Sequence, residues 1–275
     1  MTLLTKARSI WKEFAAVGAA THASSIAYYT FLSLVPLLAL CISLVSLVGI
    51  SEQEVYSLLT AFVPDALSDL AHALVTDAYD RSGIALSLSS LSLLWSASKG
   101  AKALRVGLNA AYAERETRNA VVVVGISILA VLVMGILIAA AMWLVFGNSV
   151  LRALSQHIPG LQEHDAVLEF ADLVGTLAAG MLIIALCYTH LPAGSRRLKG
   201  QLPGAVFSLV GCGVLSIGFR VYVDRVANYT VLYGSIATVA MLLFWMYLVF
   251  YIVVAGGFVN RYLQESRGAG VDPRG

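Results

Sequence analysis

Apolar residues form long blocks along most of the chain, and short polar segments separate these blocks. A helix needs about 20 mostly apolar residues to cross the hydrocarbon core of a bilayer. Four blocks have this length, a fifth is long enough but carries two acidic residues near its start, and a sixth is serine-rich and has only 16 residues. The pattern predicts an all-α polytopic membrane protein with six transmembrane helices, at about residues 28–50, 83–98, 120–146, 167–190, 202–223 and 232–258.

Shorter stretches predict helices outside these spans. Near the start of the chain, apolar residues recur at helical spacing beside Lys6 and Lys12, which predicts a short amphipathic helix in the membrane interface. Between the first two spans, two amphipathic segments flank Pro64 and carry six acidic residues, which predicts a small helical cap on the outer side. We therefore expect one membrane domain over residues 1–265 and a flexible cytoplasmic tail over residues 266–275.

Composition and charge support this prediction. The chain is 59% hydrophobic and 12% charged, whereas soluble domains carry about a quarter of charged residues. With six spans, four basic residues fall on one side of the membrane: Arg81, Arg152, Arg220 and Arg225. The other side receives Lys6, Arg8, Lys12, Lys99, Lys102, Arg105, Arg115, Arg118, Arg196, Arg197, Lys199, Arg261, Arg267 and Arg274. The positive-inside rule therefore favours a crossing by 83–98 and places both termini in the cytoplasm.

The basic segment 99–119 follows the serine-rich span and continues its helical periodicity. Leu104, Leu108 and Ala111 share one face, and Lys102, Arg105 and Asn109 face elsewhere. A basic loop also suits nucleic acid, but a juxtamembrane helix beside anionic lipid explains the same pattern. We favour the lipid interpretation and expect membrane lipids, and no nucleic acid, as partners.

Three stretches carry a resemblance to a known family. "ASSIAYYTFLSLVPLL", "LWSASKGAKALRVGLNAAY" and "NYTVLYGSIATVAMLLFWMYL" resemble the YihY/BrkB family of bacterial inner-membrane proteins, in order from Ala23 to Asn260. Among the family's recurrent residues, Asn109, Tyr112, Gly204 and Asn260 have counterparts here. The resemblance implies six transmembrane helices and an address in the inner membrane.

The same resemblance bears on function. Members have been called ribonuclease BN, a label generally regarded as mistaken, and others have been tied to serum resistance or to lipid export. The family often has a carboxylate shortly before the final Asn of its last span, and this chain has Phe258 at that position. A mechanism that depends on that acid is therefore not implied for this chain.

Polar residues at membrane depth are costly, so they are the first candidates for a substrate path. Asp172 and Arg220 are expected at similar depth on adjacent spans, where they either pair or extend separately into the outer interface. Ser89, Ser92 and Ser96 form one stripe on the second span, which faces either a polar path or a neighbouring helix.

Aromatic and basic residues at the span ends supply the remaining candidates. On the inner side, a basic pocket for an anionic head group is expected from Tyr28, Tyr29, His190, Arg196 and Arg197. Tyr229 and Tyr233 flank the last span on the outer side. Tyrosines at span ends also serve as plain interface anchors, so both interpretations stay open.

Catalytic and metal-binding patterns are not evident in the sequence. Cys41, Cys187 and Cys212 lie in apolar runs, and the inner carboxylates are scattered. A metal-dependent nuclease needs clustered carboxylates, so a nuclease, a metal site and a cofactor are not expected. The sequence favours an exporter of an amphiphilic, anionic, lipid-like or small organic substrate. The alternative is a membrane scaffold or envelope-integrity factor that transports nothing, and a homo-oligomer is compatible with either.

Overall fold

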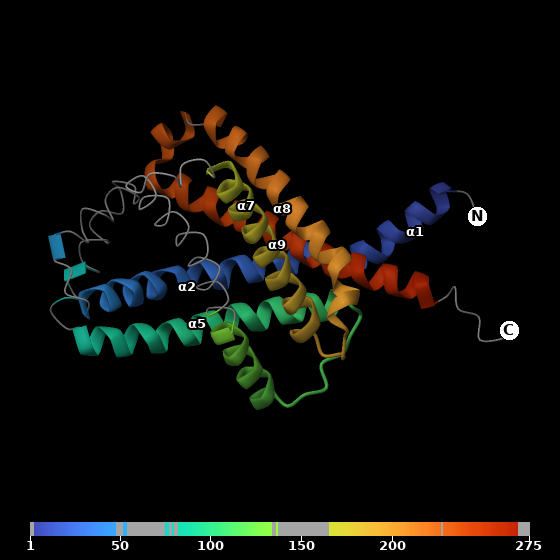
Figure 1. The fold of residues 1–275 in the computed structure, drawn as a ribbon, viewed down its shortest axis with the longest axis horizontal. Helices are drawn as coiled ribbons and strands as arrows, with labels where there is room; N and C mark the ends of the chain where they lie inside the picture. Colours follow the sequence, from blue (N-terminus) through green and yellow to red (C-terminus); the bar gives the residue numbers. More distant parts are fainter. Residues whose placement is uncertain are drawn as a thin grey trace. The chain divides into compact units, whose positions relative to one another are not determined.

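The computed structural model describes residues 3–47, 52–53, 75–76, 79, 82–133, 136, 165–226 and 228–268. Its helices include α1 (Leu3–Ala16), α2 (Ala19–Leu47), α5 (Ser82–Ala111), α7 (Asp165–His190), α8 (Leu198–Val226) and α9 (Asn228–Gly268), drawn in Figure 1. A further apolar helix covers Ala120–Val133. No strand occurs in these described ranges, which confirms the all-α prediction.

Three of the described helices contain segments long and apolar enough to cross a membrane: Leu173–His190, Leu198–Val223 and Val239–Ser266. The first two predicted spans coincide with parts of α2 and α5, which are helical there. The count of six spans stays a prediction. The outer cap also stays a prediction, because most of residues 51–80 lie outside the described part of the chain.

Several helices run further than the apolar pattern alone predicts. α5 continues without a break from the serine-rich segment through the basic segment to Ala111, as the periodicity of 99–111 indicates. α9 continues to Gly268, into the first residues of the predicted tail. Arg261 and Glu265 lie one turn apart on this extension and form an ion pair of 3.6 Å, which is compatible with a helix that has left the membrane.

Two residues with positive φ end helices. Gly18 (φ 64°) separates α1 from α2, and the amide of Gly18 donates to the carbonyl of Ala15. Ala113 (φ 55°) ends α5, where the amide of Glu114 donates to the carbonyl of Asn109 over 2.8 Å. This helix ending normally has glycine at the left-handed position, because a β-carbon is strained there.

Replacing Ala113 with glycine should therefore stabilise the protein, by about 1 kcal/mol, since it removes the strained β-carbon. The matched control is Ala110→Gly, three residues earlier inside α5, which should destabilise by about 1 kcal/mol. Thermal unfolding in detergent measures both. A lower melting temperature for the Ala113 variant would contradict the strained helix ending.

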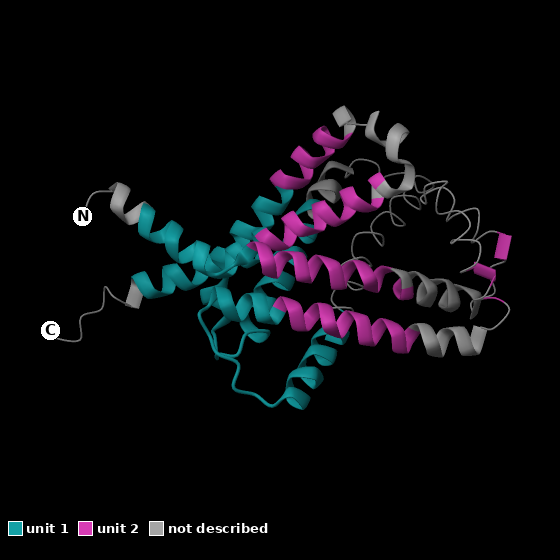
Figure 2. Ribbon diagram, turned by 180° about the vertical axis from the view of Figure 1, so that it is seen from behind, with its two compact units in different colours: residues 1–19, 105–213, 252–275 teal, residues 20–104, 214–251 magenta. Residues whose placement is uncertain are grey.

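Packing divides the chain into two compact units, each built from separate segments (Figure 2). Unit 1 contains residues 1–19, 105–213 and 252–275, and unit 2 contains residues 20–104 and 214–251. Within unit 2, α2 and α5 run side by side: Gly100 lies against Thr30, and the ammonium of Lys99 lies 6.0 Å from the centre of the Tyr29 ring. The prediction of one domain over residues 1–265 stays a prediction.

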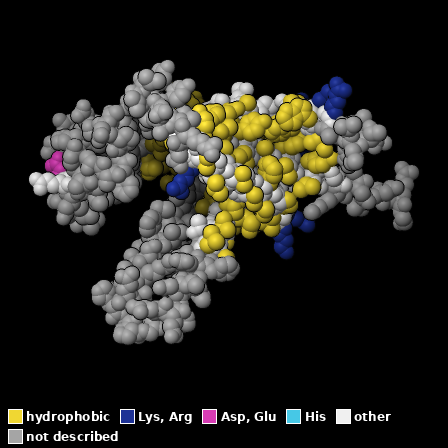
Figure 3. Space-filling model, turned by 90° about the horizontal axis from the view of Figure 1, so that it is seen from above, with side chains coloured by type: hydrophobic (Ala, Val, Ile, Leu, Met, Phe, Trp, Pro, Cys, Tyr) yellow, Lys and Arg dark blue, Asp and Glu magenta, His cyan; other side chains and the backbone are white. Residues whose placement is uncertain are grey.

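Large apolar side chains cover much of the described surface. Val121 is 83% exposed, and Leu91, Ile136 and Ile217 are also highly exposed. Figure 3 shows one face on which the described side chains are mainly hydrophobic and few Lys or Arg side chains interrupt them. Monomeric soluble proteins rarely expose apolar patches of this extent, whereas a surface in contact with lipid requires them.

Candidate functional site

The largest set of buried polar side chains in the described part of unit 1 lies where α5, α7, α8 and α9 meet. We call it the polar cluster. The residues of the polar cluster are Arg105, Asn109, Tyr112, Glu116, Tyr188, Gln201, Ser208 and Asn260. All except Glu116 are buried. Buried polar groups are costly unless they find partners, so their hydrogen bonds determine what this cluster does.

Asn260 connects α9 to the beginning of α8. Its side-chain oxygen accepts from the amide of Gly204 over 2.6 Å, and its side-chain nitrogen donates to the carbonyl of Gln201 over 3.1 Å. The same nitrogen donates to the Tyr112 hydroxyl over 3.1 Å, and that hydroxyl donates to Oε1 of Gln201 over 2.6 Å. One amide therefore joins the end of α5, the start of α8 and the end of α9.

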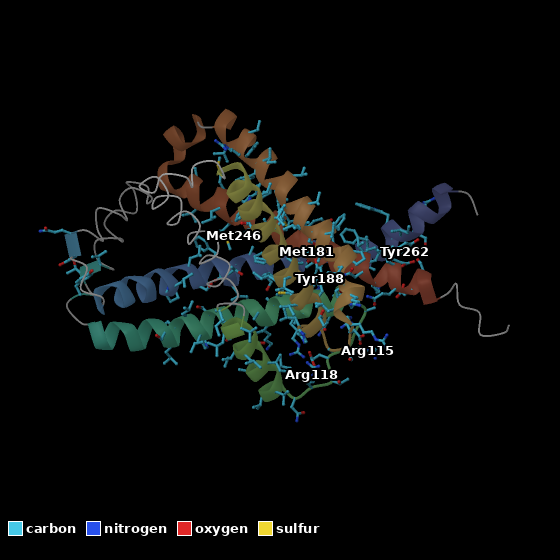
Figure 4. All side chains as sticks on the ribbon, in the orientation of Figure 1. Arg115, Arg118, Met181, Tyr188, Met246 and Tyr262 are labelled. Carbon is cyan, nitrogen blue, oxygen red and sulfur yellow. The ribbon has the colours of Figure 1, made fainter. Side chains whose placement is uncertain are left out.

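A second hydrogen-bonded group lies around Tyr188, which Figure 4 marks on α7. The Tyr188 hydroxyl lies 2.6 Å from the Ser208 hydroxyl and donates to the carbonyl of Val253 over 2.6 Å. Glycines allow this contact: a methyl group on Gly256 would collide with both hydroxyls and with the carbonyl of Gly204. α7, α8 and α9 therefore pack here through polar groups and backbone, with small residues at the crossing.

Charged residues tie the segment after α5 to the rest of unit 1. Arg105 is only 1% exposed, and its NH2 atom lies 2.6 Å from Oε2 of Glu116. Asn109 donates to the same carboxylate over 3.3 Å and accepts from the amide of Ala193 over 2.8 Å. In the described part of the chain, the Nε and NH1 atoms of Arg105 are buried without a hydrogen-bond partner. Glu116 is therefore the main group that offsets the buried charge of Arg105.

Arg196 forms the second charged contact of this segment. Its guanidinium lies 2.9 Å from Oε1 of Glu114 and 4.1 Å from the centre of the Tyr112 ring. Burial raises the pKa of Tyr112 to about 12, and the hydrogen bond from Asn260 and the charge of Arg196 oppose this shift. The phenol is therefore neutral at physiological pH and acts as a hydrogen-bond donor.

The raised pKa of Tyr112 predicts a loss of stability at high pH. Between pH 10 and 12 the unfolded chain releases the phenol proton and the folded chain keeps it. The contribution of Tyr112 to the free energy of unfolding is therefore full below pH 10 and falls as the pH rises above 10. The stability difference between wild type and Tyr112→Phe should shrink by up to about 3 kcal/mol over this range. Thermal unfolding from pH 9 to 12 measures it, and a constant difference would contradict the prediction.

A cavity of about 460 Å³ lies between α7 and the helix Ala120–Val133, both in unit 1. Its walls are mainly apolar and include Ile126, Leu129, Val133 and Leu186. Arg118 and His190 also line it, and Figure 4 marks Arg118 just before the helix that begins at Ala120. Arg118 precedes one helix and His190 ends the other, so one end of the cavity is cationic or polar and its body is apolar. We call it the amphiphilic cavity.

Two of the predicted site residues lie in the parts of unit 1 just described. His190 lines the amphiphilic cavity, and Arg196 lies against the polar cluster through Tyr112. Arg197, beside it, is exposed. Tyr28 and Tyr29 belong to unit 2, where their rings lie 5.4 Å apart edge to face. A common inner pocket of these five residues stays a prediction.

The remaining predicted site residues are less fully described. Arg220 is exposed, and the side chains of Asp172, Ser89, Tyr229 and Tyr233 lie outside the described residues, so the Asp172–Arg220 pair stays a prediction.

The serine stripe has different surroundings along its length. Ser92 is exposed, and Ser96 is buried with its hydroxyl donating to the carbonyl of Ser92 over 2.8 Å. Ser96 thus satisfies its hydroxyl within α5. Whether the stripe borders a path stays a prediction.

Sequence reasoning missed the polar cluster. The sequence places Arg105 and Asn109 off the apolar stripe of α5, on a basic helix expected beside anionic lipid, and the structure buries both side chains. One sequence feature could have indicated the polar cluster. Arg105, Asn109 and Tyr112 are spaced at i, i+4 and i+7, which places them on one helix face. The partners on α8 and α9 are far away in the sequence and gave no local signal.

No group of three or more His, Cys, Asp or Glu residues that could hold a metal ion occurs among the described residues. The charged members of the polar cluster pair with each other, and the cavity has a single histidine. The arrangement can therefore hold an anionic head group beside an apolar chain.

Comparisons with known proteins agree with the resemblance found in the sequence. A protein family described as virulence factor BrkB matches residues 10–275. A ribonuclease-like protein, YfkH, of Bacillus subtilis is 30% identical over 250 residues, which cover 90% of both chains. A UPF0761 membrane protein of Alteromonas mediterranea is 25% identical over 254 residues, or 89% of this chain and 82% of the relative. No solved structure matches the chain.

Proposed function

Because the chain belongs to the BrkB family of membrane proteins, we propose that it binds an anionic, lipid-like amphiphile and moves it across the bacterial inner membrane. The amphiphilic cavity carries this proposal. Its volume of about 460 Å³ lies in the range of small-molecule sites, about 300–1,000 Å³. An acyl chain would lie along Ile126, Leu129 and Leu186, and an anionic head group would lie against Arg118 and His190.

The proposed topology has six spans with both termini in the cytoplasm. The distribution of basic residues supports it, as do the helical α2 and α5 over the first two predicted spans. It puts the Arg118 end of the cavity at the cytoplasmic surface, where anionic lipids are available. Cysteines introduced at Asp69 and Arg115 should label from opposite sides of intact cells, and labelling of both from outside would exclude six spans.

The route beyond the cavity belongs to the same proposal. Of the predicted path residues, His190 lines the cavity. Asp172, Arg220, Tyr229 and Tyr233 are proposed to line the outer half of the path, and the serine stripe of α5 its wall. These assignments rest on their predicted depth and polarity.

Lipid translocation in proteoliposomes tests the function. A fluorescent phosphatidylglycerol placed in the inner leaflet should become accessible to an impermeant quencher faster with protein than without it, and phosphatidylcholine should move more slowly. Arg118→Gln should lower the phosphatidylglycerol rate about fivefold, since one cation near an anionic head group contributes roughly 1 kcal/mol. The matched control Arg115→Gln removes an exposed arginine three residues away and should keep the rate. Equal rates with and without protein would exclude transport of these lipids.

A second candidate function is a non-transporting scaffold. The polar cluster favours it, because its hydrogen bonds link α5, α7, α8 and α9 to one another and so fasten the helices. A scaffold would be needed for envelope integrity although the folded protein moves no lipid. The ribonuclease-like name belongs to the Bacillus relative. Neither proposal assigns catalysis to this chain.

A further inference from the structure

A second apolar groove lies in unit 1, along the amphipathic helix α1. It has a volume of about 340 Å³ and is lined by Ile10, Trp11 and Phe14 of α1, Phe207 of α8, and Ala255 and Phe258 of α9. None of these residues lines the amphiphilic cavity. Trp11 is 67% exposed beside the groove, an unusual position for an indole unless lipid covers it.

α1 is held against α9 by aromatic and charged contacts. The ring of Phe14 lies edge-on to the ring of Phe258, with 5.3 Å between the centroids. The guanidinium of Arg261 lies 5.0 Å from the centre of the Phe258 ring, a distance at which a cation is attracted to the ring face. The guanidinium of Arg261, one turn beyond Phe258 on α9, therefore lies next to the wall of the apolar groove.

The charges around the groove favour an anion. Arg261 contacts Glu13 over 3.8 Å and Glu265 over 3.6 Å, near the upper limit for an ion pair. Its Nε atom, which makes the contact with Glu265, is buried and makes no hydrogen bond in the described part of the chain. Arg8 and Lys12 are exposed one turn apart on α1. Arg8, Lys12 and Arg261 thus outnumber Glu13 and Glu265 in this part of unit 1, and the Arg261 guanidinium keeps unused donor capacity.

We propose that this groove holds one acyl chain of an anionic phospholipid of the cytoplasmic leaflet, with the lipid phosphate against Arg261. The apolar walls match an acyl chain, and the guanidinium can donate two parallel hydrogen bonds to a phosphate. Such a lipid completes the contact between α1 and α9. The site is separate from the amphiphilic cavity and does not depend on transport.

Quenching of Trp11 by brominated lipid tests the site in the full-length protein in nanodiscs. The Trp11 signal is the emission of the wild type minus that of Trp11→Phe. Brominated phosphatidylglycerol should quench it about fivefold more efficiently than brominated phosphatidylcholine at equal mole fraction. Arg261→Gln should abolish this preference, and the matched control Arg115→Gln should keep it. Ala255→Phe, which fills the groove, should reduce quenching by both lipids.

Three outcomes would overturn the proposal. The first is equal quenching by both lipids in the wild type, and the second is an unchanged preference in Arg261→Gln. The third is quenching by neither lipid, which would mean that protein, such as a second copy of the chain, covers the groove. Circular dichroism and gel filtration check that Arg261→Gln and Ala255→Phe are folded, and if one is not, the comparison uses the other.

Discussion

Replacing Asn260 with leucine is expected to lower the free energy of unfolding by about 4 kcal/mol, although the two side chains have similar volumes. The change leaves the amide of Gly204 without the Asn260 acceptor, and it removes one donor each from the carbonyl of Gln201 and the hydroxyl of Tyr112. Each buried polar group left unpaired costs about 1–3 kcal/mol, and the hydroxyl keeps its bond to the Gln201 side chain. Thermal and denaturant unfolding in detergent measure the loss.

The matched control for Asn260 lies one turn further along α9. The Gln264 side chain donates to the carbonyl of Gly200 over 3.1 Å, but Gln264 is exposed, so water can replace it. Gln264→Leu should therefore cost less than about 1 kcal/mol. Equal losses for the two variants would show that Asn260 does not hold α8 and α9 together through buried hydrogen bonds.

Replacing Glu116 with glutamine is expected to cost about 3 kcal/mol. It leaves the guanidinium of Arg105, 1% exposed, without the carboxylate that lies 2.6 Å away. Removing one partner of a buried pair costs about 3–5 kcal/mol, and the partial exposure of Glu116, at 29%, favours the lower end. The double variant Arg105→Met with Glu116→Gln should recover most of the loss, because neither charge remains.

The control for this prediction is the other acidic residue of the same segment. Glu114 is 40% exposed and pairs with Arg196 over 2.9 Å. Because ion pairs near the surface contribute at most about 1 kcal/mol, Glu114→Gln should have a small effect. Additive losses for Arg105→Met and Glu116→Gln in a double-mutant cycle would show that the two side chains do not interact.

Much of the local structure could be predicted from the sequence because it depends on periodicity within single segments. The apolar stripe near the N-terminus corresponds to α1, Leu3–Ala16, and the spacing of Leu104, Leu108 and Ala111 indicates that α5 continues beyond the serine-rich segment. Both features arise from contacts between residues three or four apart. His190 and Arg196 were candidates for a similar reason, since polar residues at span ends face the membrane surface, and their place in a functional site stays a prediction.

The polar cluster could not be predicted in this way. Tyr112 and Asn260 are 148 residues apart, and Asn109 and Ala193 are 84 apart, so the pairing depends on how the helices pack. Arg105 follows Lys99 and Lys102 on a basic helix, and charge alone does not distinguish a buried arginine from its exposed neighbours. Family resemblance marked Asn109, Tyr112 and Asn260 as recurrent without showing that they lie in one cluster.

Filling the amphiphilic cavity tests most directly whether an anionic lipid moves through it. Ala130 lines the cavity, whereas Val121, on the same helix, is 83% exposed and does not line it. Proteoliposomes with Ala130→Trp should translocate fluorescent phosphatidylglycerol no faster than protein-free liposomes, and Val121→Trp should keep the wild-type rate, with both variants folded. A wild-type rate for folded Ala130→Trp would contradict the account.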